Sequence, residues 1–412
     1  MKSKEAYQKG VHMTKYHKRL VLNLFVLTFV LGTSEFVIVG LLSEVAAGLH
    51  IGISTAGSLV SVFAITFAIG TPILTAVFSR FAKYPLMLSL ITIFIAGNIM
   101  TALADSYELL LVSRMITALV TGVLIALAMS VASESVPLEK RGSAVAIIFA
   151  GFTIASVVGV PLGTLIGQQY GWHMVFWFTA LLGVISLIAS SATIPKALQG
   201  NRSSLQKQLG LFANSRIIIA FFIPACSIAA TYTVYTYLTP ILQDVMAVPT
   251  PYISLVFLLY GVVSIFSTFI GGKLAANNGI SKLRFVFLAQ AIILASLYLS
   301  SRSLVAGLIS ISLIALLVYT MNSTMQLYFI DLADRHSPTA RDLASSLTPV
   351  SVNVGIALGS TLGGFVTTSS RLIDVSWTGG LVAIAAAVLA GISYRLDHNS
   401  SQLCNDPAGA KC

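Results

Sequence analysis

The stretch LVAGLISISLIALLVYTMNSTMQLYFI, residues 304–330, contains no charged residue. About 20 apolar residues in a helix cover the roughly 30 Å of a bilayer core, because an α-helix rises about 1.5 Å per residue. Strands of a membrane barrel would instead show segments of about ten alternating residues. This stretch therefore predicts a membrane-spanning helix, and similar runs recur along the chain.

We predict an all-α integral membrane protein whose twelve transmembrane helices form two pseudo-symmetric six-helix bundles. The composition agrees, since 56% of the 412 residues are hydrophobic and 9% are charged, against about 25% charged in soluble domains. The expected spans are 20–42, 54–78, 85–104, 107–133, 143–167, 172–194, 217–242, 252–275, 283–300, 304–330, 343–366 and 375–394.

The basic residues predict the orientation, because Lys and Arg concentrate in cytoplasmic loops. With both termini cytoplasmic, 21 of the 24 basic residues fall on the inner side, and the exceptions are Arg114, Arg302 and Arg371. We expect a multi-pass protein of a bacterial inner membrane. Residues 1–19 lead into an apolar run too long for a signal peptide, so the first helix should remain as an anchor, with Met1 or Met13 as the start.

The net charge of +10 can indicate a nucleic-acid partner. No basic stripe with interleaved aromatic residues exists, so we expect the basic loops to face anionic lipid and no nucleic acid. The three cysteines and six histidines show no disulfide or metal spacing. We therefore expect no metal, no cofactor and no catalytic residue.

The polar stretch 195–216, PKALQGNRSSLQKQLGLFANSR, is the expected cytoplasmic linker. It separates two segments of similar length, 20–194 and 217–395, each with six spans, between an N-terminal segment 1–19 and a tail 396–412. Internal duplication of this kind is typical of transporters.

Glycines repeat at the same positions in the two halves. Subtracting the three positions of the fifth span from those of the eleventh gives 355 − 159 = 363 − 167 = 196, and likewise 359 − 163 = 196. A spacing of four puts each set on one helix face, which favours close helix packing. We expect a packing or gating role for Gly122, Gly151, Gly159, Pro161, Gly163, Gly167, Gly355, Gly359 and Gly363. Pro161 and Pro240 interrupt helical hydrogen bonding and predict hinges or fixed bends.

Two charged residues lie well inside the spans, away from the span ends: Glu35 in GTSEF and Arg114 in LVSRMITAL. Such residues are costly in a bilayer and are candidates for function. Glu35 lies about 10 Å and Arg114 about 8 Å below the outer end of its span. The arginine favours the ionised carboxylate and desolvation favours the neutral acid, so Glu35 is a candidate proton carrier. A static ion pair is the alternative.

Polar side chains without charge are expected to line a substrate cavity. In TYTVYTYLTP, Tyr232 and Tyr235 share a helix face and suit stacking with organic ligands, whereas Tyr237 points elsewhere and fits an interfacial aromatic belt. Asn322, Gln326 and Asn353 are further candidates, with interhelical hydrogen bonding as the alternative role.

The chain resembles the major facilitator superfamily, and within it the twelve-helix drug:proton antiporters. The similarity rests on residues 134–177, which are similar to the antiporter signature of helix five. GTSEFVIVGLLSEVAAGL at 32–49 and YTYLTPIL at 235–242 resemble sugar (arabinose-type) and purine or nucleoside efflux permeases. The resemblance implies alternating access and export of a small molecule in exchange for protons. It places Arg114 and Gly122 in the helix-four signature and associates Arg114 with coupling. We expect a monomer.

The chain departs from that family at its loops. Members usually carry G-x-L-a-D-r-x-G after helix two, whereas here Gly70 precedes TPILTAVFSRFAK, with Arg80 and Lys83 but no acidic partner. Ala276 stands where Asp is expected after helix eight, and Val160 replaces the Gly before Pro161. The loop gating that the family implies is therefore open to question.

Three other functions can be weighed. A proton-coupled importer of the same fold is disfavoured because TIPKALQGNRSS lacks the Pro-Glu-Ser-Pro-Arg pattern of sugar importers. An intramembrane enzyme is disfavoured because the spans lack a Ser-His-Asp set or an H-E-x-x-H motif. A non-transporting sensor would need a sizeable soluble output domain, and none is expected.

Overall fold

The computed structural model describes residues 13–200, 215–275, 279–336 and 341–405. Most of the linker and Ala276 lie outside these residues. Twelve helical segments of the described chain are long and apolar enough to cross a membrane, so the predicted number of spans is confirmed. Because lipid offers backbone groups no hydrogen-bond partners, continuous helices are the expected solution for such segments.

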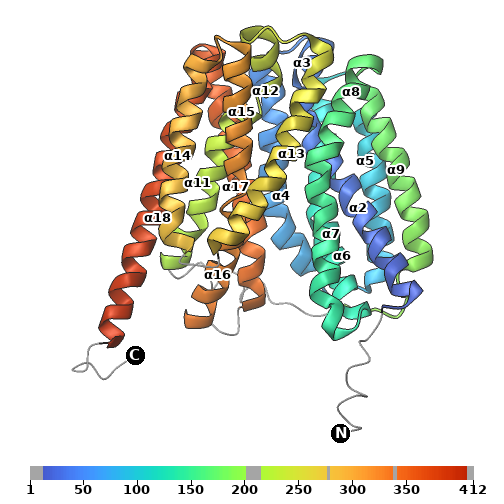
Figure 1. The fold of residues 1–412 in the computed structure, drawn as a ribbon. Coiled ribbons are helices and arrows are strands. Elements are labelled where there is room, and N and C mark those ends of the chain that lie inside the picture. The colour runs from blue at the N-terminus through green and yellow to red at the C-terminus, as the bar shows by residue number, and fades with distance from the viewer. Residues whose placement is uncertain (1–12, 201–214, 276–278, 337–340, 406–412) are drawn as a thin grey trace. The chain divides into compact units, whose positions relative to one another are not determined.

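The helices of the first part of the chain are shown from blue to green in Figure 1. They are α2 (Lys15–Gly40), α3 (Leu42–Gly48), α4 (Ile53–Phe78), α5 (Lys83–Ala102), α6 (Tyr107–Ser135), the 3₁₀ turn Leu138–Lys140, α7 (Arg141–Ile154), the π-helix Ala155–Gly159, α8 (Val160–Tyr170) and α9 (Trp172–Thr193).

The second part contains α11 (Ser215–Tyr235), α12 (Leu238–Pro240), the π-helix Ile241–Val245, α13 (Thr250–Ala275), α14 (Gly279–Ser300), α15 (Leu304–Val318), α16 (Asn322–His336), α17 (Arg341–Ser369), the 3₁₀ turn Leu372–Asp374 and α18 (Val375–Asn405). Several of the predicted spans are therefore interrupted helices. Each π-helix adjoins a proline that the sequence predicted as a bend, Pro161 in one case and Pro240 in the other.

The chain packs as two compact units. Unit 1 comprises the described residues within 1–37 and 70–203, and unit 2 those within 38–69 and 204–412. Within unit 2, the hydroxyl of Thr239 donates to the carbonyl of Val39 and that of Ser54 donates to the carbonyl of Gly364. These bonds attach residues 38–69 to helices that follow the linker. The two six-helix bundles remain a prediction at the boundaries that the sequence suggested.

Each unit has a buried interior and an apolar outer surface. In unit 1, α5 packs against α6 and α9, and in unit 2, α11 packs against α17 and α18 while α14 lies along α18 (Figure 1). Large apolar side chains such as Ile188, Phe269 and Ile292 are 65–70% exposed. Such exposure would be costly in water but matches a surface that faces lipid tails.

The repeated glycines lie at close helix contacts. Counted by the order of the spans, helix one is α2, helix five is α7 with α8, helix seven is α11 and helix eleven is α17. In unit 1, a Cβ at Gly151 would collide with the carbonyl of Phe25, and one at Gly159 with Thr33, so helix five lies against helix one. In unit 2, a Cβ at Gly355 would lie 2.5 Å from the carbonyl of Ala225.

Three further glycines extend these two contacts, and Gly122 and Gly167 lie elsewhere. Gly163 faces Val37 of helix one, and Gly359 and Gly363 face the carbonyls of Ala229 and Thr233 on helix seven. Gly122 faces Thr71, and Gly167 is buried, its carbonyl accepting from Gly171. Helix five thus packs on helix one as helix eleven packs on helix seven.

Candidate functional site

Glu35 and Arg114 lie together in unit 1, on α2 and α6. The side chain of Arg114 is completely buried and Glu35 is 6% exposed. The guanidinium donates from Nη1 to the carbonyl of Ser34 at 2.7 Å and from Nη2 to the carbonyl of Glu35 at 3.1 Å. Arg114 therefore binds the backbone of helix one directly.

The Glu35 carboxyl group is held less completely. Its Oε2 atom is buried and has no hydrogen-bond partner among the described residues. A buried ionised carboxylate is costly unless it is paired and fully hydrogen-bonded, and a proton on the group removes much of that cost. This geometry suits a carboxyl group that gains and loses a proton.

A buried polar network surrounds this pair, and sequence reasoning missed it. The hydroxyl of Ser34 donates to Oδ1 of Asn98 at 2.8 Å, and the hydroxyl of Thr101 donates to that of Ser113 at 2.8 Å. All four side chains are at least 99% buried. Asn98 is an amide within a largely apolar span, and such amides often bond across helices, which is the signal that identifies it.

The tyrosines predicted to line a cavity form part of an aromatic cluster in unit 2. The ring of Tyr235 lies 5.3 Å from that of Tyr232, 6.0 Å from that of Phe257 and 4.7 Å from that of Tyr260, centroid to centroid. Phe257 and Tyr260 come from α13 and were absent from the sequence prediction. Aromatic pairs at these distances stabilise helix contacts, so the cluster has a structural role in addition to any role in binding.

The predicted amides are distributed over two helices. Asn322 is the first residue of α16 and Gln326 lies one turn further along, both half-buried. Asn353 of α17 is buried and donates to the carbonyl of Pro349 at 3.2 Å. Oδ1 of Asn322 and Oδ1 of Asn353 are buried without a hydrogen-bond partner in the described part of the chain, so each retains an acceptor.

Tyr237 differs from the expectation of an interfacial belt. Its side chain is fully buried, and its hydroxyl donates to the carbonyl of Ser360 at 3.1 Å. The ring lies where Cβ atoms of Gly57 and Gly363 would otherwise stand. The glycines provide the space, which is why the tyrosine is buried within unit 2 instead of facing the membrane surface.

Comparison with known proteins identifies the family. The family model for the Major Facilitator Superfamily matches residues 24–340. The chain belongs to this superfamily. It is 40% identical over 383 residues to the uncharacterised MFS-type transporter YtbD of Bacillus subtilis, covering 93% of this chain and 97% of YtbD. It is 31% identical over 368 residues to the inner membrane transport protein YdhP of Escherichia coli K12, covering 89% and 92%.

Solved structures support the superfamily fold. A bacterial homologue of the lysosomal transporter Spinster matches with a TM-score of 0.76 at 16% identity, over 95% of this chain and 98% of the other. The nucleoside transporter NupG matches with a TM-score of 0.73 at 16% identity, over 93% and 99%. The relatives of this chain are transporters, and its fold is that of transporters, so the chain is a transporter of this superfamily and not an enzyme. Among the described residues, no cluster of His, Cys, Asp or Glu could hold a metal.

One superfamily feature is built differently here. The loop after helix two lacks the expected acid, but the ammonium of Lys83, at the start of α5, forms an ion pair with Glu134 near the end of α6 and donates to the hydroxyl of Ser130 at 2.7 Å. This pair could not be predicted from the sequence, because Lys83 and Glu134 lie 51 residues apart.

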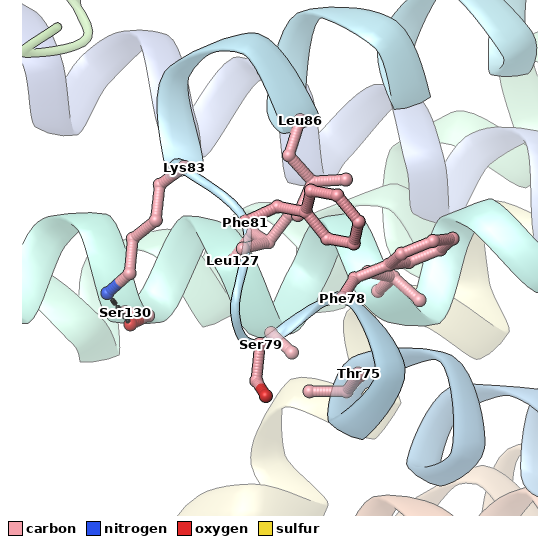
Figure 2. Close-up of a pocket in the computed structure, with 10 residues that line it drawn as sticks. Thr75, Phe78, Ser79, Phe81, Lys83, Leu86, Leu127 and Ser130 are labelled. Carbon is pink, nitrogen blue, oxygen red and sulfur yellow. Dashed lines mark hydrogen bonds between the residues drawn. The ribbon is translucent and has the colours of Figure 1, made fainter. Parts of the chain in front are cut away.

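A small cavity of about 110 Å³ lies beside Lys83. Figure 2 shows the lysine directed at Ser130, with the apolar side chains Phe78, Phe81 and Leu127 close by. The ion pair and the cavity belong to unit 1 alone, at the inner ends of α4, α5 and α6 as the predicted orientation places them. Lys83, the first residue of α5, is thus paired with an acid from another helix of the same unit.

Proposed function

We propose that this chain is a proton-coupled exporter of a small organic solute, such as a sugar, a purine or nucleoside, or a drug, working by alternating access as a monomer. The observation that carries the proposal is the buried Glu35 carboxyl group, with an unpartnered oxygen, beside an arginine bound to the backbone of the same helix. The export direction rests on the resemblance of residues 134–177 to the antiporter signature.

Glu35 and Arg114 divide the work of coupling. Arg114 keeps its two backbone acceptors in both protonation states of the acid, so the helices stay attached while the proton moves. Glu35 takes a proton when its surroundings are open to the outer side and releases it when they open to the cytoplasm. The tyrosines and amides of unit 2 contact the solute through ring faces and neutral hydrogen bonds, which favours uncharged solutes.

The test uses everted membrane vesicles with an acidic interior and three labelled solutes, arabinose, adenosine and chloramphenicol. An exporter accumulates its solute inside such vesicles, and nigericin abolishes the accumulation by collapsing the pH gradient. Glu35→Gln should reduce accumulation to the nigericin level, whereas Glu108→Gln, a change at an exposed acid of α6, should not.

Three results would contradict the proposal. Full gradient-driven accumulation in Glu35→Gln would remove the proton role of this residue. Loss of solute from preloaded vesicles when the interior is acidified would reverse the direction to import. Tight binding of a solute without flux in proteoliposomes would favour a sensor.

A further inference from the structure

Helix ten is interrupted in the middle of its span. The span covers Leu304–Leu332, but α15 ends at Val318, α16 begins at Asn322, and residues 319–321 form a turn. Sharp breaks in helices usually occur at Pro, at Gly/Ser pairs or at π-bulges. Residues 308–330 contain neither Pro nor Gly. Within the turn, the hydroxyl of Thr320 donates to the carbonyl of Leu317 at 2.7 Å, and the break is also contacted from another helix.

Two residues of α13 contact this break. The hydroxyl of Ser267 accepts the backbone N–H of Tyr319 at 2.9 Å, which satisfies a donor that the break releases. Gly271 lies four residues further, on the same face of α13. A Cβ at this glycine would lie 2.5 Å from the carbonyl oxygen of Thr320 and 3.0 Å from its Cα. The hydrogen bond of Ser267 and the absence of a side chain at Gly271 together allow the turn to pack against α13.

The turn decides where α16 starts. Asn322 is its first residue and Gln326 follows after one turn, so the position of the turn fixes the direction of both amides. Oδ1 of Asn322 is buried and has no hydrogen-bond partner in the described part of the chain, so it keeps a free acceptor. In lipid, a broken helix is tolerated where it is buried in protein or lines a cavity.

We propose that Ser267 and Gly271 are positioning residues for solute binding, which hold the break in helix ten and thereby direct Asn322 and Gln326 at the solute. This inference rests on the proposed function, in which the two amides contact the solute. Neither residue touches the solute itself in this arrangement, since Ser267 is fully buried and bound to the backbone of Tyr319.

Helix seven has a second break, which a serine contacts through side chains. Its break, at Thr236 and Tyr237, is held by Ser360 of α17, whose hydroxyl bonds that of Thr236 at 2.8 Å and whose carbonyl accepts from Tyr237. Gly364 again follows the serine by four residues, and a Cβ there would lie 2.8 Å from the tyrosine hydroxyl oxygen. A serine followed by a glycine four residues later thus contacts both breaks, and at helix ten the serine also bonds a backbone N–H group.

The first test measures hydrogen–deuterium exchange of the full-length protein in detergent, resolved to single amides. Ser267→Ala should speed exchange of the Tyr319 amide about threefold to tenfold, the effect of losing one hydrogen bond. Gly271→Ala should speed exchange across residues 319–322. The matched controls lie on the same helix: Ser264, whose hydroxyl bonds Gly261 of its own helix, and Gly272, around which a Cβ would meet nothing within 4 Å.

The second test measures concentration dependence of transport for arabinose, adenosine and chloramphenicol in the vesicle assay. Ser267→Ala and Gly271→Ala should raise KM severalfold with a smaller change in maximal rate. Ser267→Thr keeps the hydroxyl group and should therefore show the KM of the unmodified protein. Ser264→Ala and Gly272→Ala should leave KM unchanged. In an Asn322→Ala background, Ser267→Ala should add little, because it acts through that residue.

The outcomes separate this inference from the proposed function. Transport with an unchanged KM in both α13 variants would overturn the positioning role while the exporter proposal stands. If none of the three solutes is transported, the exporter proposal fails for these solutes. Hydrogen–deuterium exchange of the Tyr319 amide then tests whether Ser267 and Gly271 hold the break. Unchanged exchange in Ser267→Ala and Gly271→Ala would then overturn the inference.

Discussion

At the scale of single residues, Arg114 illustrates how a buried charge is accommodated. Its guanidinium bonds two successive carbonyls of helix one and lies 5.9 Å from the centre of the Phe176 ring. A planar group with several fixed donors can serve two carbonyls at once, whereas a lysine ammonium is a single point of charge. The static ion pair considered from the sequence is therefore an incomplete description, because the backbone is a principal partner of the arginine.

Arg114→Lys should accordingly destabilise the protein although the charge is kept. Losing one charge-assisted hydrogen bond and the contact with Phe176 should cost about 2 kcal/mol and lower the midpoint of thermal unfolding in detergent by several degrees. Arg302→Lys, at an exposed position, provides the control and should leave the midpoint unchanged. Equal midpoints for the two variants would mean that the second carbonyl contact contributes nothing.

At the scale of helices, glycine spacing decides which elements can approach each other. Helix five contacts helix one through Gly151, Gly159 and Gly163, and helix eleven contacts helix seven through its own glycines. The π-helix Ala155–Gly159 lies within this contact. The predicted correspondence between the halves therefore has a physical basis, since equivalent helices use the same residue type against equivalent partners.

Gly151→Ala should test the contact between helices five and one. The added Cβ would meet the carbonyl of Phe25 and the hydroxyl of Thr28, and overpacking of this kind costs about 1–3 kcal/mol. Gly142→Ala on the same helix meets nothing within 4 Å and should be neutral or slightly stabilising. Thermal unfolding of both variants in detergent measures the difference, and equal stability would show that the helices separate without cost.

At the scale of the whole molecule, charge and its absence distinguish the two units. Unit 1 contains the buried pair Glu35 and Arg114, whereas the candidate solute contacts of unit 2 are tyrosines and amides. Energy coupling and solute recognition are thus proposed for different parts of the chain. The distribution of basic residues outside the spans predicts the orientation of the protein in the membrane.

The orientation can be tested with single cysteines in a variant lacking Cys226, Cys404 and Cys412. A cysteine at position 302 should react with a membrane-impermeant maleimide in intact cells, because the predicted topology places it outside. A cysteine at Arg141 should react only after permeabilisation. Both positions are exposed, so a difference in labelling reports the side of the membrane, and the reverse pattern would invert the topology.

The sequence by itself determined the fold class, the twelve spans and the matched glycines. Each of these depends on local information: a bilayer requires uninterrupted apolar runs, and a helix places residues four apart on one face. The two intramembrane charges were also visible, because any charge stands out in an apolar span.

Only the tertiary structure decided which groups these residues contact. The guanidinium of Arg114 bonds a carbonyl 80 residues away, Lys83 pairs with an acid 51 residues away, and the break in helix ten is held by a serine 52 residues away. Tyr237 is buried for the same reason, because glycines of other helices leave room for its ring. Contacts of this kind depend on how helices pack, and the pattern within one helix does not contain that information.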